Sequence, residues 1–85
     1  MHDTFLNQNL YESVIDICNE NAIAKILKLT ITVHTHSHIS ESSIREYFTE
    51  RKNSLVGDWT NIQVQRQEIE PLTAVIDEID GEIFQ

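Results

Sequence analysis

The first apolar pattern in the chain repeats with the period of an α-helix. Over residues 4–21, apolar side chains recur at spacings of four, four, three and one, at Leu6, Leu10, Val14, Ile17 and Cys18. These positions fall on one face of a helix. Asp3 is a suitable N-cap residue and its charge suits the positive end of the helix dipole. The pattern therefore predicts an amphipathic helix, with Cys18 as a core residue on its apolar face.

The next segment changes to the period of a β-strand. Over residues 24–36, apolar and polar side chains alternate. The apolar series is Leu27, Leu29, Ile31 and Val33, and the polar series is Lys28, Thr30, Thr32, His34 and His36. Alternation with β-branched residues is typical of a strand with one buried and one solvated face. Such a strand fits a sheet that is covered on one side only.

A second helix is expected to begin near Ser40. Either Ser40 or Ser43 can act as its N-cap, and residues 43–46 fit a capping box. The inward stripe of this helix consists of Ile44, Tyr47, Phe48, Arg51 and Leu55. Gly57 is then expected to end the helical region.

Two short strands, at residues 61–69 and 72–79, complete the pattern. Pro71 separates them because proline cannot donate a hydrogen bond to a ladder. The pair Asp80-Gly81 is typical of a turn. The order helix, strand, helix, strand, strand predicts one α+β domain spanning all 85 residues, with two helices packed on one face of a small three-stranded sheet.

Size and cysteine content restrict how such a small core can be stabilised. The chain has 85 residues and one cysteine, which excludes both an internal disulfide and a zinc ribbon built from CxxC pairs. No apolar run is long enough to span a bilayer, and the first residues lack the pattern of a signal peptide. We therefore expect a cytoplasmic protein with no membrane partner, present as a monomer or a weak homodimer.

The net charge of the chain limits which classes of partner are expected. The net charge is −8, and the acidic residues dominate both ends of the chain. Because a phosphate backbone or an anionic membrane would be repelled, neither is an expected partner. A cation or a basic protein surface is compatible with this charge, and solubility alone is the alternative explanation.

Motifs for catalysis are missing from the sequence. It contains no G-x-S-x-G, P-loop or G-x-G-x-x-G pattern and has two glycines in all. The carboxylates are scattered over polar positions, without the paired spacing that general acid–base chemistry requires. The sequence therefore predicts a binding protein and not an enzyme.

The first three residues carry donors for a divalent metal. A free α-amino group at Met1, together with the amide nitrogen and imidazole of His2, can form two small chelate rings around one ion. Nitrogen donors in a plane suit Ni²⁺ or Cu²⁺, and Asp3 can fill the fourth position. We expect Met1 to be retained because removal of an initiator methionine generally requires a small second residue. The alternative is that His2 has no role.

His34, His36 and His38 form a second candidate site. On a strand, residues two apart lie roughly 6.5–7 Å from each other on one face, so two imidazoles can share a metal ion. The simpler interpretation is an exposed strand end whose histidines titrate near neutral pH. A supporting role for these histidines requires that the strand end approach His2.

Several segments together resemble a known family. Met1-His2-Asp3 leads directly into a helix; residues 39–48 (Ile-Ser-Glu-Ser-Ser-Ile-Arg-Glu-Tyr-Phe), 68–71 (Glu-Ile-Glu-Pro) and 73–80 (Thr-Ala-Val-Ile-Asp-Glu-Ile-Asp) follow at matching positions. The chain resembles the HypA/HybF family of hydrogenase maturation proteins, small metallochaperones that deliver nickel. The resemblance implies His2 as the principal Ni²⁺ ligand, Asp3 at the position of the family's glutamate, and a maturation GTPase or a metalloenzyme precursor as partner.

The chain departs from that family in ways that leave other functions open. The family's zinc ribbon is absent between Pro71 and Leu72, so no structural zinc is expected, and residues 34–38 (His-Thr-His-Ser-His) replace an Ile-Gly region. One alternative is a protein–protein adaptor that has kept the fold and lost nickel delivery. Another is a regulatory module that competes with a full-length HypA-like relative for the same partner.

Overall fold

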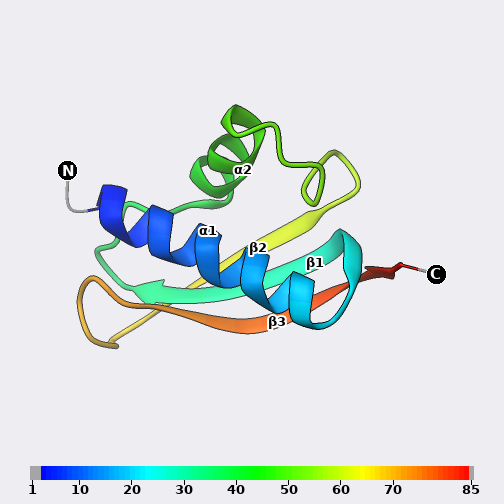
Figure 1. Ribbon diagram of the computed structural model, residues 1–85. Coiled ribbons are helices and arrows are strands. Elements are labelled where there is room, and N and C mark those ends of the chain that lie inside the picture. The colour runs from blue at the N-terminus through cyan, green and yellow to red at the C-terminus, as the bar shows by residue number, and fades with distance from the viewer. Residues whose placement is uncertain (1–2, 85) are drawn as a thin grey trace.

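The computed structural model describes residues 3–84, and the side chains from Phe5 onward (Figure 1). Its elements are α1 (Asp3–Glu20), β1 (Ile23–His34), α2 (Glu41–Glu50), β2 (Asn61–Gln67) and β3 (Ala74–Ile83). The predicted α+β class and the order of elements are confirmed. Neither α1 nor α2 is long and apolar enough to cross a membrane.

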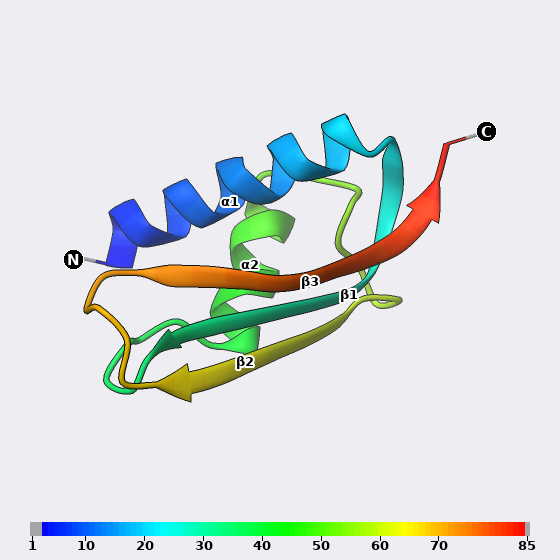
Figure 2. The ribbon, with the colours of Figure 1, turned by 90° about the horizontal axis from the view of Figure 1, so that it is seen from below.

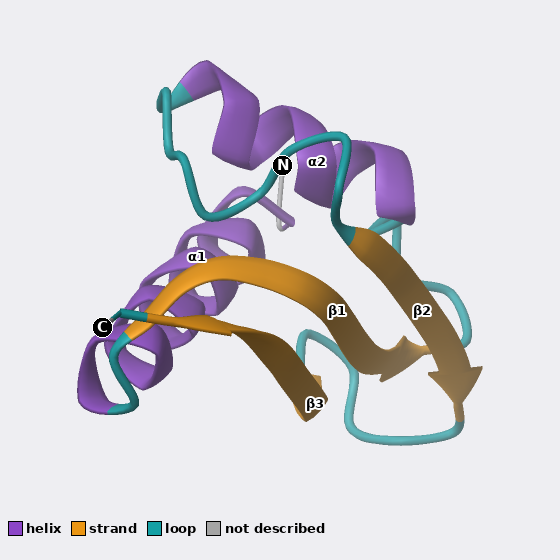
Figure 3. Ribbon diagram, turned by 90° about the vertical axis from the view of Figure 1, so that its right-hand side faces the viewer, coloured by secondary structure: helices purple, strands orange, loops and turns teal. Residues whose placement is uncertain are grey.

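The sheet is built around β1. β2 pairs with β1 in parallel, and β3 pairs with the opposite edge of β1 in antiparallel orientation, so the strand order is β2-β1-β3. Parallel pairing requires a crossover connection, and α2 lies within that connection. The segment 68–73 joins the two outer strands past the end of β1 (Figure 2). As Figure 3 shows, both helices cover one side of the sheet, as predicted.

The core lies between the helices and the inner face of β1. Its buried apolar side chains are Leu6, Leu10, Val14, Cys18, Ile23, Ile26, Leu29, Ile31, Val33, Ile39, Ile44, Phe48, Val56 and Ile62. The predicted core position of Cys18 is confirmed, since the residue is 1% exposed. Burial raises the pKa of its thiol, so the side chain behaves as a small apolar group.

The alternation predicted along β1 fails in its first half. Ile26 and Leu29 are fully buried, whereas Leu27, predicted to point inward, is 38% exposed. The pairing of β1 with β3 shifts register between Ile26 and Lys28. An extra residue at such a bulge changes which side chains face inward. The simple period of two therefore holds only from Leu29 onward.

The polar face of β1 is less exposed than its pattern suggests. Thr30 and Thr32 are only 6% and 4% exposed, although they lie on the side of the sheet away from the helices. The hydroxyl of Thr32 lies within hydrogen-bond distance of Gln65 on β2, at 3.4 Å, and of Asp77 on β3, at 2.5 Å. Long side chains from the two outer strands thus cover the central strand.

The turn predicted at Asp80-Gly81 is wrong, because both residues lie within β3. Gly81 pairs with Ile26 beside the bulge in β1. A Cβ atom at this position would overlap the backbone carbonyl of Lys25. The glycine is needed for a close approach of two strands, and β3 consequently continues to Ile83.

The start of α2 follows the prediction more closely than its end. Ser40 is the N-cap, and the capping box joins Ser40 to Ser43, one turn before the predicted box at residues 43–46. The helix ends at Glu50, before the predicted limit at Gly57. The segment that follows is irregular, and α2 itself holds it in place.

Arg45 is the residue that fixes this irregular segment. Its guanidinium donates hydrogen bonds to the carbonyl oxygens of Gly57, at 2.7 Å, and of Thr60, at 2.8 Å. The buried hydroxyl of Thr60 donates in turn to the carbonyl of Ile26, at 2.7 Å. Trp59, in the same segment, is 44% exposed, and its Nε1–H donates to the carbonyl of Leu55 at 3.3 Å.

Candidate metal-binding site

The predicted N-terminal ligands mostly fall outside the structure. Met1 and His2 lie outside the described residues, and Asp3 is described only as the first residue of α1. The proposed chelate at these three residues therefore stays a prediction of the sequence. The structure does describe the end of α1 to which they are covalently joined, and what surrounds it.

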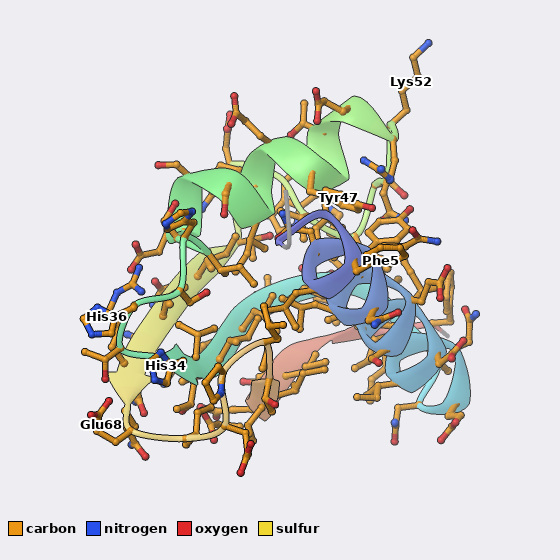
Figure 4. The ribbon with its side chains drawn as sticks, turned by 90° about the vertical axis from the view of Figure 1, so that its left-hand side faces the viewer. Phe5, His34, His36, Tyr47, Lys52 and Glu68 are labelled. Atoms are coloured by element: carbon orange, nitrogen blue, oxygen red, sulfur yellow. The ribbon has the colours of Figure 1, made fainter. Side chains whose placement is uncertain are left out.

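The structure brings two of the three clustered histidines together. His34 is the last residue of β1, and His36 follows in the turn toward α2. Their ring centroids are 5.5 Å apart (Figure 4). The backbone N–H of His36 donates to Nδ1 of His34, at 3.1 Å. Because Nδ1 accepts this hydrogen bond, its lone pair is engaged and the neutral ring carries its proton on Nε2.

A carboxylate stands beside that nitrogen. Nε2 of His34 is 3.7 Å from Oε2 of Glu68, which follows β2. The hydroxyl of Thr35 donates to the same oxygen, at 2.6 Å. This hydrogen bond is the main reason that the pKa of Glu68 lies below its usual value; partial desolvation opposes the shift, and positive charge at His34 and His36 adds to it. The carboxylate is thus kept ionised next to an imidazole.

A hollow of about 250 Å³ links the histidines to α1. Its lining combines apolar side chains with imidazoles and consists of Leu6, His34, His36, Ser37, His38, Pro71 and Leu72. Leu6 belongs to the first turn of α1. The N-terminal end of α1 and the histidine-bearing end of β1 therefore border the same hollow, which the sequence alone did not establish.

Arg66 holds the histidine segment against the sheet. Its guanidinium donates to the carbonyl oxygens of Ser37 and Ile39, each at 2.7 Å. The segment 35–40 is thereby fixed at both ends, by β1 on one side and by the Ser40 cap of α2 on the other. Fixed backbone restricts where the imidazoles can move, which suits a ligand site.

The described side chains do not complete a metal site by themselves. Within residues 5–84, no group of three or more His, Cys, Asp or Glu side chains is arranged to hold a metal ion. Glu68 can contribute a carboxylate oxygen, and His34 can contribute a ring nitrogen once the hydrogen bond to its Nδ1 is broken; imidazole suits Ni²⁺, Cu²⁺ and Zn²⁺. Their chemistry fits a supporting position next to an ion whose remaining ligands come from elsewhere in the chain.

Glu68 was not a candidate in the sequence analysis, although a signal for it existed. A strand, a helix and a strand in succession are typical of parallel pairing, and parallel strands place their carboxyl ends at the same edge. The register indeed pairs His34 with Gln67. Glu68, the residue after Gln67, therefore lies beside the histidines. Predicting this position requires the strand register as well as the order of the elements.

Comparisons with known proteins find no relative of this chain. No family model matches this chain, and searches of curated proteins and of solved structures return no match. The resemblance to the HypA/HybF family consequently remains a prediction that depends on the residues quoted above.

Proposed function

We propose that this protein is a nickel-binding accessory protein that holds Ni²⁺ at Met1, His2 and Asp3 and passes it to an acceptor. The α-amine, one amide and one imidazole supply nitrogen donors of the type that Ni²⁺ prefers. The observation that supports the proposal is the hollow that Leu6 of α1 shares with His34 and His36. An ion bound at the start of α1 would have these imidazoles within its neighbourhood.

The electrostatics around the N-terminal end of α1 suit a carrier that must also release its ion. The positive end of the α1 dipole opposes a cation. The carboxylate of Glu68 attracts a cation, and the hydrogen bond from the hydroxyl of Thr35 stabilises the ionised form of that carboxylate. These opposing contributions limit the affinity without preventing binding, as transfer to an acceptor requires.

The acceptor is proposed from the family resemblance. A maturation GTPase or a metalloenzyme precursor would take the ion, with this chain as an accessory protein and not as a catalyst.

Calorimetry with Ni²⁺ tests the proposal directly. The untagged protein, with an intact mass that shows an unmodified Met1, is expected to bind one ion per chain. His2→Ala should weaken binding by about 100-fold, and His34→Ala by about tenfold, the size expected for a supporting residue. Gln8→Ala, an exposed change on α1, is the matched control and should leave affinity unchanged.

Two outcomes would contradict nickel delivery from the N-terminus. Full affinity in the His2→Ala variant would move the site to the histidines at the end of β1. A lack of binding in the unmodified protein would favour the adaptor, the second candidate function. The observation that favours this second candidate is the exposed acidic edge of the sheet that β3 forms.

A further inference from the structure

β3 presents a free edge along its whole length. It spans ten residues, Ala74–Ile83, and pairs with β1 on one side. Within residues 3–84 no strand lies on its other side, because β3 ends the order β2-β1-β3. Figure 2 shows this strand on the side of β1 opposite to β2. An unpaired edge offers N–H and C=O groups to another strand.

One face of this edge strand is acidic. The register places Glu78, Asp80 and Glu82 opposite Thr30, Lys28 and Lys25, on the face away from the helices. We call these three carboxylates the acidic row; all are exposed. Lys28 lies 3.4 Å from Glu78 in an exposed pair, which is a weak interaction in water. Most of the negative charge of the row therefore faces solvent.

Beside the strand lies a groove of mixed polar and apolar lining. The groove has a volume of about 300 Å³ and runs between the last turns of α1 and β3. Four isoleucines supply its apolar lining and Asp80 of the acidic row borders it; the full lining is Ile17, Asn21, Ile23, Ile79, Asp80, Gly81 and Ile83. Ile83 is 62% exposed and Phe84 is 67% exposed. This groove, which we call the edge groove, has room for apolar side chains from outside the domain.

We propose that β3 binds an extended segment of a partner protein with alternating basic and apolar residues, which joins the sheet as a fourth strand. Side chains of a strand point alternately to its two faces. A strand beside β3 therefore directs its basic residues to the acidic row and its apolar residues to the edge groove. Main-chain hydrogen bonds to the edge supply affinity, and the alternating side chains supply specificity.

A second copy of this chain does not fit the same edge. Pairing of two β3 strands would bring two acidic rows next to each other, on the same face of a continuous sheet. Like charges directly opposite each other on paired strands are destabilising. The same carboxylates that attract a basic segment thus prevent self-association through β3, a known use of charge on edge strands.

The inference does not depend on nickel. A nickel carrier would use this edge to dock on its acceptor, and an adaptor would use it for its main contact. Loss of metal binding would therefore leave the proposal intact, and loss of peptide binding would leave nickel binding intact.

A synthetic peptide tests the docking mode. The probe is a capped ten-residue peptide of alternating lysine and valine, titrated into the ¹⁵N-labelled protein at low salt. We expect amide shifts and slowed amide exchange concentrated in Ala74–Ile83, with the Asn61–Gln67 edge unaffected. A peptide of the same sequence with alternate backbone N-methylation cannot complete the ladder and should bind about tenfold more weakly.

Matched charge variants test the acidic row. The triple change Glu78→Gln, Asp80→Asn, Glu82→Gln should weaken peptide binding by about tenfold, as three exposed charge pairs would. The control is Glu12→Gln, Glu46→Gln, Glu50→Gln, which neutralises three exposed carboxylates on the helices and should change affinity by less than about threefold. Dispersed amide spectra confirm that both variants fold.

Three results would overturn the proposal. One is equal weakening in both charge variants, which would indicate nonspecific attraction to an acidic protein. Another is unchanged affinity of the N-methylated peptide, which would exclude strand addition. The third is a dimer at neutral pH whose protected amides map to β3, which would make a second copy the occupant.

Discussion

The two outer strands of the sheet flank the same central strand and are stabilised in opposite ways. The surroundings of β2 are held by arginines: Arg66 bonds to the carbonyls of Ser37 and Ile39, and Arg45 holds the segment that enters β2. β3 has side-chain contacts with β1 through Asp77 and Glu78. The β2 side is thus fixed by hydrogen bonds from the half-buried Arg45 and the exposed Arg66 to backbone carbonyls, and the β3 side directs its carboxylates to solvent.

This difference follows from how the chain distributes its charge. Arg45 and Arg66 are engaged with backbone carbonyls, Arg51 stacks 3.3 Å above the ring of Tyr47, and Lys25 lies 4.8 Å from the ring of Trp59. Within residues 5–84 none of these four cations forms an ion pair with a carboxylate. The carboxylates, which outnumber the cations, consequently face solvent, and β3 carries three of them along one edge.

The largest contrast between the two sides should appear when one cation from each is removed. Arg45→Met deletes two part-buried hydrogen bonds from a charged donor to backbone carbonyls, and we expect it to lower the free energy of unfolding by about 2 kcal/mol. Lys28→Met deletes an exposed ion pair, and we expect a loss of less than about 1 kcal/mol. Urea denaturation measures both values. Equal losses would contradict the view that the β2 side depends on its arginine contacts.

A smaller effect should appear at the carboxylate on the β2 side. Because the pKa of Glu68 is lower in the folded protein than its usual 4.5, the ionised group favours folding above that pH. This contribution is lost as the pH falls through the lowered folded value. Thr35→Val removes the hydroxyl that bonds to Glu68, so its carboxyl should titrate at a higher pH by NMR.

Two further variants sharpen this titration. Thr35→Ser keeps a hydroxyl and should preserve the lowered pKa of Glu68. Thr49→Val removes a different exposed threonine hydroxyl, which donates to the carbonyl of Arg45, and should have no effect on Glu68. If Thr35→Val leaves the titration of Glu68 unchanged, the nearby imidazoles and not the hydroxyl control this carboxylate.

Local sequence patterns were enough to predict the helices and strands. The predictions that failed concern positions that depend on pairing between distant strands. The helical face around Cys18 and the Ser40 cap depend on neighbours within a few residues, and both were predicted. Leu27 and Gly81 depend on the bulge where β1 meets β3. Nothing in the spacing along either strand specifies that irregularity, so the inward position of Leu27 and the turn at Gly81 were wrong.

The candidate site also combines features that the sequence predicted with features that only the structure shows. His34 and His36 were predicted to be close on one face of a strand, but β1 ends at His34, and it is the turn that follows which places their rings 5.5 Å apart. The approach of Glu68 and Leu6 required the parallel register and the packing of α1. The roles of Met1 and His2 rest on chemistry alone, because these residues lie outside the described part of the chain.

Paramagnetic NMR tests most directly whether the metal ion binds at the start of α1, next to the hollow. Cu²⁺, which takes the same planar nitrogen donors as Ni²⁺, would be added in substoichiometric amounts to the ¹⁵N-labelled, unmodified protein. We predict that amide signals broaden around the hollow, at Leu6, His36 and Leu72, while Gly81 and Glu82 at the far end of β3 keep their intensity. Broadening centred on the acidic row instead, or unchanged broadening at the hollow in the His2→Ala variant, would contradict a metal site at the start of α1.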